Sequence, residues 1–132
     1  MFFIGTSVWI DYVNGKATVQ TDKLDNLLSS TIIIIGDLVL AEILQGFRED
    51  QDYQLVKQLL QKLELISLCN ISTGIKSADN YRKLRKQGIT VRKTIVCLMA
   101  MYCIANNLPL LYADQDFEPF KTHFGLQSAL LL

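Results

Sequence analysis

The sequence has few of the residues that build several common kinds of site. It has a single histidine, His123, so a zinc site with histidine ligands is not expected. Its three cysteines, Cys69, Cys97 and Cys103, include no Cys-x-x-Cys pair, and an odd number cannot all close into disulfides. They indicate a reducing compartment in which the thiols serve as small core residues.

Net charge, glycine loops and long apolar runs are also missing. Thirteen basic residues balance thirteen acidic ones, so the overall charge says nothing about a nucleic-acid partner. No glycine loop of the dinucleotide- or nucleotide-binding type occurs, which disfavours an unrelated phosphate-binding domain. No apolar run approaches the roughly 20 residues of a membrane span, and the N-terminus lacks signal-peptide features. We therefore expect a cytoplasmic protein with no membrane partner.

What the sequence does have is an alternation of short apolar runs and helical patterns, and half of it is apolar. Strands are expected at 2–4, 31–35, 65–68, 110–112 and, as a last edge strand, 127–130. Helices are expected at 6–13, 22–29, 37–45, 50–62, 71–87, 93–106 and 117–124, the first of them capped by Thr6 or Ser7. The isoleucines of 31–35 are typical of a strand buried on both faces. This predicts one α/β domain, residues 1–132, as a three-layer α/β/α sandwich with a short, mostly parallel central sheet.

Acidic residues fall near the ends of these predicted strands. In open parallel sheets, ligands bind at the carboxyl ends of the strands. Glu42 lies on the helix after the isoleucine strand, and Asp114 and Asp116 follow the 110–112 strand. Carboxylates gathered there would suit Mg²⁺ or Mn²⁺, which prefer oxygen ligands. The alternative is that they are helix caps and solvated ends, which from spacing alone is the commoner case.

The chain resembles the VapC-type PIN-domain toxins in three stretches: FFIGTSVWIDYVNG, DLVLAEILQG and VRKTIVCLMAMYCIANNLPLLYADQDFEPF. These follow the order and spacing of the family's motifs over nearly the whole chain. The resemblance implies a PIN-like fold and an Mg²⁺-dependent endoribonuclease that cleaves RNA phosphodiesters. It also implies a VapB-type antitoxin that keeps the toxin silent, and a homodimer.

Carried over by position, the resemblance implies a catalytic set made of Glu42, Asp114 and Asp116. Glu42 and Asp114 would be the ligands of Mg²⁺ or Mn²⁺, and Asp116 would lie next to them. Thr6 or Ser7 would support the site at the end of the first strand.

Two positions depart from the family pattern. Gly5 and Val96 stand where the family has its first and third Asp, and Asp11 lies too far along its helix to substitute. The pocket should keep about half of its negative charge and bind Mg²⁺ weakly, because Mg²⁺ gives up water reluctantly. We expect impaired cleavage. The chain is either a naturally decayed paralogue or a copy with inactivating substitutions, deliberate or selected, and the otherwise intact motifs favour the second.

A basic cluster adds a candidate contact to RNA. It consists of Arg82, Lys83, Arg85, Lys86, Arg92 and Lys93. Arg92 and Lys93 begin a helix, where the dipole disfavours cations, so contacts to RNA phosphates are favoured for these two. For the other four, a solvated helix end that complements the dipole is an equally good interpretation.

A second hypothesis belongs to a different class of protein. The chain would be a non-catalytic PIN-fold module that binds an antitoxin or a second copy of itself. Trp9, Tyr12 and the apolar stripe from Tyr53 to Leu63 are candidates for such a surface, although stripes of this kind are more often core.

Overall fold

A computed structural model describes all residues, 1–132, and has one parallel sheet at its centre. The strands are β1 (Phe2–Ile4), β2 (Ile33–Gly36), β3 (Glu64–Ile66) and β4 (Leu110–Leu111). Their order across the sheet is β3-β2-β1-β4, and every pairing is parallel. Each strand is short, so all four end close together at the same edge of the sheet.

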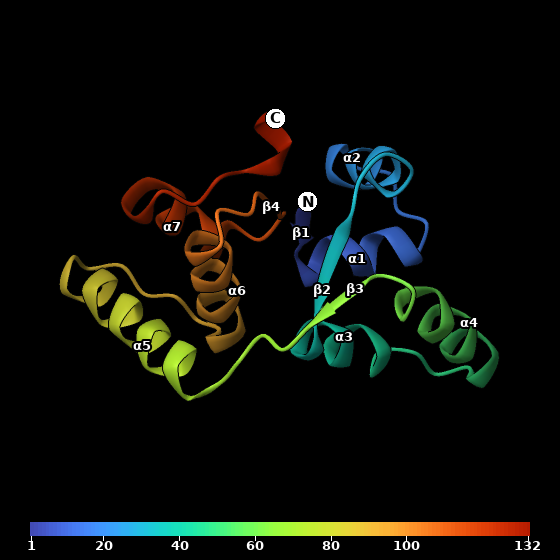
Figure 1. The fold of residues 1–132 in the computed structure, drawn as a ribbon, viewed down its shortest axis with the longest axis horizontal. Helices are drawn as coiled ribbons and strands as arrows, with labels where there is room; N and C mark the ends of the chain where they lie inside the picture. Colours follow the sequence, from blue (N-terminus) through green and yellow to red (C-terminus); the bar gives the residue numbers. More distant parts are fainter.

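Helices cover both faces of this sheet (Figure 1). They are α1 (Thr6–Val13), α2 (Val19–Leu28), α3 (Asp37–Leu44), α4 (Asp50–Leu60), α5 (Ile71–Lys86), α6 (Thr94–Ala105) and α7 (Glu118–Phe124), with short 3-10 turns η1 (Gln115–Phe117) and η2 (Ala129–Leu131). In Figure 1 the first four helices lie to the right of the strands and the last three to the left. The predicted three-layer α/β/α sandwich is confirmed. None of the helices has the length and apolarity needed to cross a bilayer.

The isoleucines of β2 and the apolar residues of α6 belong to one hydrophobic core. Ile33, Ile34 and Ile35 are almost wholly buried, which explains why this strand has no polar face. α6 is apolar nearly all round, because it lies between the sheet and α5 and is buried from both sides. This arrangement holds the start of α6, with Lys93 and Val96, against the end of the sheet.

The expected last edge strand does not form. Ser128 makes a single parallel bridge to Leu110, and the chain then turns into η2. The physical reason is the length of β4, which has only two residues and so offers a neighbouring strand almost nothing to pair with. The prediction of a last edge strand at 127–130 was therefore wrong, although the Ser128 bridge places this segment beside β4.

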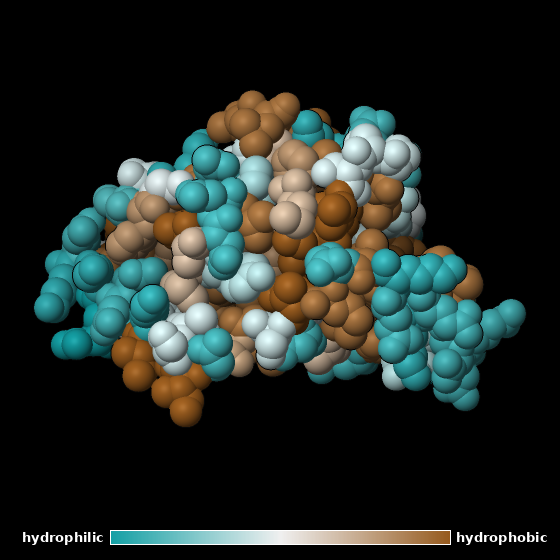
Figure 2. Space-filling model, in the orientation of Figure 1, coloured by the Kyte–Doolittle hydropathy of each residue, from teal (hydrophilic) through white to brown (hydrophobic).

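Exposed apolar side chains gather at two ends of the molecule. Ile71 and Ile75 lie at the start of α5, and Leu131 and Leu132 at the end of the chain. Figure 2 shows both as brown surface, while the outer end of α5 is hydrophilic. Four basic residues lie at that hydrophilic end, and all of them are exposed: Arg82, Lys83, Arg85 and Lys86. Leu84, which lies between them in the sequence, is buried.

The three cysteines differ sharply in exposure. Cys97 and Cys103 are buried, as predicted, whereas the predicted core position is wrong for Cys69, which is exposed. Burial raises the pKa of Cys97 to about 11, helped by the charge of Asp116, and burial raises the pKa of Cys103 still further. Because the thiolate is the reactive form, neither buried cysteine should react in the folded protein.

We therefore expect a thiol reagent such as DTNB to modify Cys69 alone in the native protein near pH 8, and all three thiols after denaturation. The measurement is the number of thiols titrated per chain before and after adding guanidinium. A Cys69→Ser variant serves as the control. Rapid labelling of that variant in its native state would contradict the buried placement of the other two.

Candidate active site

The candidate site lies where the order of strands reverses. The chain forms β1, β2 and β3 side by side in one direction, and β4 then pairs with the opposite edge of β1. Crevices at such reversals, at the carboxyl ends of the strands, are where α/β sheets bind ligands. Thr6 begins α1 just after β1, and Asp114 follows β4 closely.

A pocket of about 140 Å³ opens at this point. Its lining residues are Thr6, Ser7, Ile10, Glu42, Lys93, Ile95, Val96, Met99, Asp114 and Phe117. Glu42 and Asp114, which are far apart in the sequence, therefore line the same pocket. Half of the lining is hydrophobic, so the two acids lie on a partly apolar wall.

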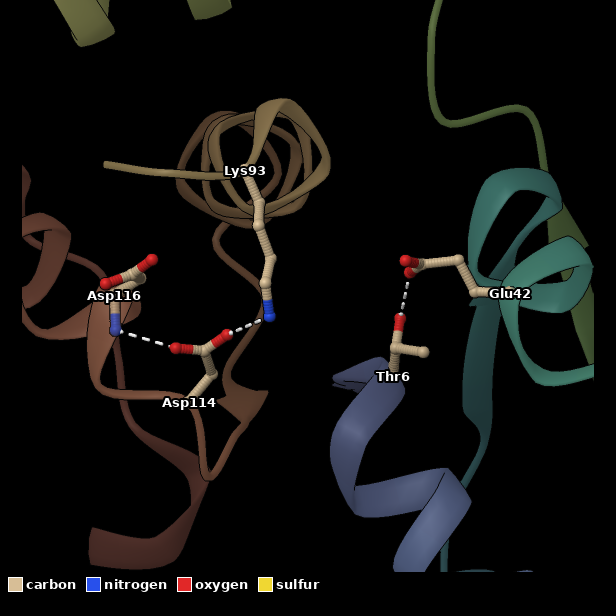
Figure 3. A network of polar contacts seen from close by, with 5 residues as sticks. All are labelled: Thr6, Glu42, Lys93, Asp114 and Asp116. Atoms are coloured by element: carbon tan, nitrogen blue, oxygen red, sulfur yellow. Dashed lines mark hydrogen bonds and ion pairs between the residues drawn. The ribbon is translucent and has the colours of Figure 1, made fainter. Parts of the chain in front are cut away.

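Glu42 comes from the second turn of α3. Its Oε1 accepts a hydrogen bond of 2.8 Å from the Thr6 hydroxyl, which links α3 to the start of α1 (Figure 3). The expected capping of α1 by Thr6 or Ser7 is wrong. Gly5 is the N-cap residue, and it has no side chain that could cap the helix. The Thr6 hydroxyl is engaged with Glu42 instead.

Asp37 fixes the start of α3 and so the position of Glu42. One of its carboxylate oxygens accepts hydrogen bonds from the N–H groups of Leu38 and Leu68, at 2.8 and 3.0 Å. Its other oxygen accepts from the Ser67 hydroxyl at 3.3 Å. The segment after β3 is thereby tied to the helix that carries Glu42.

Asp114 is held by two donors. The Asp116 N–H donates to Oδ1 at 2.9 Å, and the Lys93 ammonium donates to Oδ2 at 3.1 Å (Figure 3). Burial acts to raise the pKa of Asp114, but the Asp116 N–H and the charge of Lys93 outweigh it and leave the pKa below its ordinary value. The carboxylate is therefore charged at neutral pH.

Asp116 lies beside Asp114 but contributes its backbone to the contact. Its carboxylate is not among the groups that line the pocket. In Figure 3 it lies on the far side of Asp114 from Glu42. Ser7 lines the pocket without a hydrogen bond to either acid.

Val96 and Gly5 are the two positions at which the resemblance to the VapC-type toxins implies an Asp. Val96 is only 2% exposed and its side chain forms part of the pocket wall. Gly5 is buried, and a Cβ at this position would lie 3.3 Å from the Leu111 carbonyl oxygen. A side chain at position 5 therefore requires that carbonyl to shift by a few tenths of an ångström.

The residues present do not fit a tightly bound divalent cation. Nowhere in the protein do three His, Cys, Asp or Glu side chains gather as a metal-binding group. The pocket offers two carboxylates, and a lysine ammonium occupies one oxygen of Asp114. Mg²⁺ and Mn²⁺ take about six oxygen ligands, so nearly all of them would have to be water here.

The sequence alone did not reveal the contact between Lys93 and Asp114. The two residues lie 21 positions apart, and Lys93 was assigned to RNA phosphates because it begins a helix. The Thr6–Glu42 hydrogen bond was missed for a similar reason, since its partners are 36 positions apart. Arg92, the other predicted phosphate contact, is exposed and lies outside the pocket lining.

Comparison with known proteins agrees with this fold. The sequence matches the PIN domain over residues 2–121. It is 27% identical over 131 residues to the VapC ribonuclease Mb1587 of Mycobacterium bovis and to ribonuclease VapC11 of Mycobacterium tuberculosis, covering 98% of each chain. The crystal structure of VapBC2 from Rickettsia felis, bound to a DNA fragment from its promoter, superposes with a TM-score of 0.73. That match has 22% identity and covers 96% of both chains.

The match to the PIN domain spans nearly the whole chain and includes every strand and all of the pocket residues. The chain therefore belongs to the PIN-domain family. Within that family it is of the VapC type.

Proposed function

We propose that this chain is a toxin-type endoribonuclease scaffold, a single PIN-like domain of residues 1–132 in the cytoplasm, whose cleavage of RNA is impaired. Glu42 and Asp114 would be the metal ligands and Asp116 the adjacent acid, with Thr6 and Ser7 in support. Any Mg²⁺ or Mn²⁺ would be held weakly. Impairment follows from Gly5 and Val96, which supply no carboxylate where the family has two.

The observation that carries this proposal is the shared pocket. Glu42 and Asp114 line one hollow at the reversal of strand order, and Val96 is buried in the wall between the elements that carry them. Relatives that match the chain end to end are named ribonucleases, which supports RNA as the substrate. Arg92 and Lys93 are both exposed at the N-terminal end of α6 and are the candidates for contacts to RNA phosphates.

The experiment that tests the proposal is to restore both acids, by Gly5→Asp and Val96→Asp, and to assay RNA cleavage with and without Mg²⁺. The proposal expects cleavage by the restored chain only when the metal is present. A restored chain that folds but neither cleaves RNA nor binds metal would refute the nuclease assignment.

A VapB-type antitoxin and a homodimer are the proposed partners. The structural neighbour from Rickettsia felis is a VapBC complex, which supports the antitoxin. A small reading frame with a DNA-binding N-terminal half, encoded next to the gene for this chain, would supply the candidate to test.

One observation favours the second function, a binding module without chemistry. An apolar groove of about 270 Å³ lies between α1, α2 and α4, lined entirely by hydrophobic residues that include Trp9, Tyr12 and Leu59. The indole N–H of Trp9 is the one buried side-chain polar group without a hydrogen-bond partner. An apolar antitoxin segment would fill the groove.

Two exposed leucines on α4 provide a matched test of this groove. Leu59 is 53% exposed and lines it, whereas Leu55 is 56% exposed and does not. We expect Leu59→Glu to weaken binding of the neighbouring antitoxin about tenfold or more, because a carboxylate would be desolvated in an apolar groove. Leu55→Glu should bind normally. Equal affinities for the two variants, measured by calorimetry, would rule out the groove as the antitoxin site.

A further inference from the structure

Lys93 lies in the part of the pocket where a cation is needed. It is the N-cap residue of α6, and its side chain extends from there to line the pocket beside both acids. Figure 3 shows its ammonium reaching down between Asp114 on one side and the Thr6–Glu42 pair on the other. The ammonium nitrogen lies 3.1 Å from Asp114 Oδ2.

This contact is specific to Lys93. Thirteen lysines and arginines are present, yet the pair between Lys93 and Asp114 is the one ion pair that the structure forms. Arg92 precedes it directly, is also exposed, and pairs with no acid. The side chain of Lys93 remains 61% exposed, so burial does not force it against Asp114.

Three of the four carboxylate oxygens in the pocket already accept a hydrogen bond. Asp114 Oδ2 takes the lysine, Asp114 Oδ1 takes the Asp116 N–H and Glu42 Oε1 takes the Thr6 hydroxyl. Only Glu42 Oε2 has no hydrogen-bond donor. The charged groups lining the pocket are one cation and two anions, so a single negative charge remains. Mg²⁺ and Mn²⁺ need more oxygens and more negative charge than this.

We propose that the Lys93 ammonium is the resident cation of this pocket and that, while Glu42 and Asp114 are its only acids, it takes the place of a divalent ion and keeps Mg²⁺ and Mn²⁺ away from them. This inference rests on the proposed function in one respect, because it takes Glu42 and Asp114 as the candidate metal ligands. It gives Lys93 a role toward Asp114 that differs from contact with RNA phosphates. With Lys93 in place, one of the two negative charges in the pocket is balanced without any metal.

Lys93→Met tests the proposal, because methionine keeps most of the length of the side chain and removes its charge. Mn²⁺ binding to the full chain is measured by the loss of the free-ion EPR signal during titration, with no RNA present. We expect Lys93→Met to bind one Mn²⁺ about tenfold or more tightly than the unmodified chain, since a repelling charge next to the ligand oxygens is gone. Lys93→Arg, which retains the charge, should behave like the unmodified chain.

Arg92→Met is the matched control, because it removes the same charge one residue away. Unchanged Mn²⁺ binding by Lys93→Met, or an equal gain by Arg92→Met, would overturn the proposal. Adding Asp114→Asn to Lys93→Met should abolish the gain in Mn²⁺ affinity. A gain that survives this second substitution would place the ion elsewhere and would also overturn the proposal.

Circular dichroism verifies the fold of each variant, and Lys93→Gln serves as a second neutral variant. Because the assay contains no RNA, its failure leaves the cleavage test of the restored chain unaffected.

Discussion

A chain that carries both Gly5→Asp and Val96→Asp is expected to cleave RNA in the presence of Mg²⁺ about a hundredfold or more faster than the unmodified chain, since bound metal contributes several kcal/mol to such reactions. The two substitutions raise the number of acids at the pocket from two to four. They act from separate elements. Position 5 follows β1 and precedes the pocket residue Thr6, and position 96 lies in the first turn of α6 and lines the pocket.

Neither single substitution should restore cleavage. Three carboxylates, one of them paired with Lys93, still leave the cation short of ligands. Position 5 must also accommodate a Cβ 3.3 Å from the Leu111 carbonyl oxygen, which requires a small shift at the end of β4.

Cleavage of a fluorescent RNA is measured with Mg²⁺ and with EDTA. The control is Gly5→Asn with Val96→Asn, which has nearly the same shape and no charge. Cleavage by this neutral control as fast as by the restored chain would contradict the role of the acids.

Val96→Asp alone is expected to lower the free energy of unfolding by about 2–4 kcal/mol at neutral pH, because a carboxylate replaces a buried apolar group. Val96 is 2% exposed and lies in the same wall as Glu42 and Asp114, so the new charge gains two like charges as neighbours. Both burial and like charges raise the pKa of a carboxyl group in the folded state above its value in the unfolded chain.

The sign of the pH dependence follows from that raised pKa. Below about pH 4 the new carboxyl is neutral in both states, and the charge-dependent loss of stability is absent. The loss grows as the pH rises above the unfolded-state value, because the unfolded chain releases the proton first. Urea unfolding at several pH values, compared with Val96→Asn, measures it. A loss for Val96→Asp that equals that of Val96→Asn at every pH would show that position 96 does not face the acids.

The sequence was sufficient for the parts of the fold that depend on local pattern. The isoleucine run predicted β2 because β-branched residues without polar neighbours suit a strand that is buried on both faces. Glu42 and Asp114 could be expected near one another because parallel strands end at the same edge, and the structure places both in one pocket. Comparing the order of the motifs with the family pattern then indicated Gly5 and Val96 as positions at which the resemblance implies an Asp that this chain lacks.

Side-chain contacts between distant segments were beyond the sequence. Glu42 and Asp114 both line the pocket with Lys93, and the packing of α6 against η1, which begins after Asp114, brings Lys93 to Asp114. The stripe on α4 was taken more as core than as surface, yet Leu59 is half exposed, because α4 lies at the edge of the molecule and packs on one side only. The two-residue length of β4, which prevents a last edge strand, is likewise set by packing and not by composition.

The central claim is that Glu42 and Asp114 face one cation-sized site that lacks two acids. The most direct measurement is the anomalous scattering of Mn²⁺ in crystals of the chain with Gly5→Asp and Val96→Asp. We predict an anomalous peak between the carboxylates of Glu42 and Asp114, within bonding distance of both and of the two restored acids. A map without a peak there, or with Mn²⁺ bound only at other carboxylates, would contradict the account.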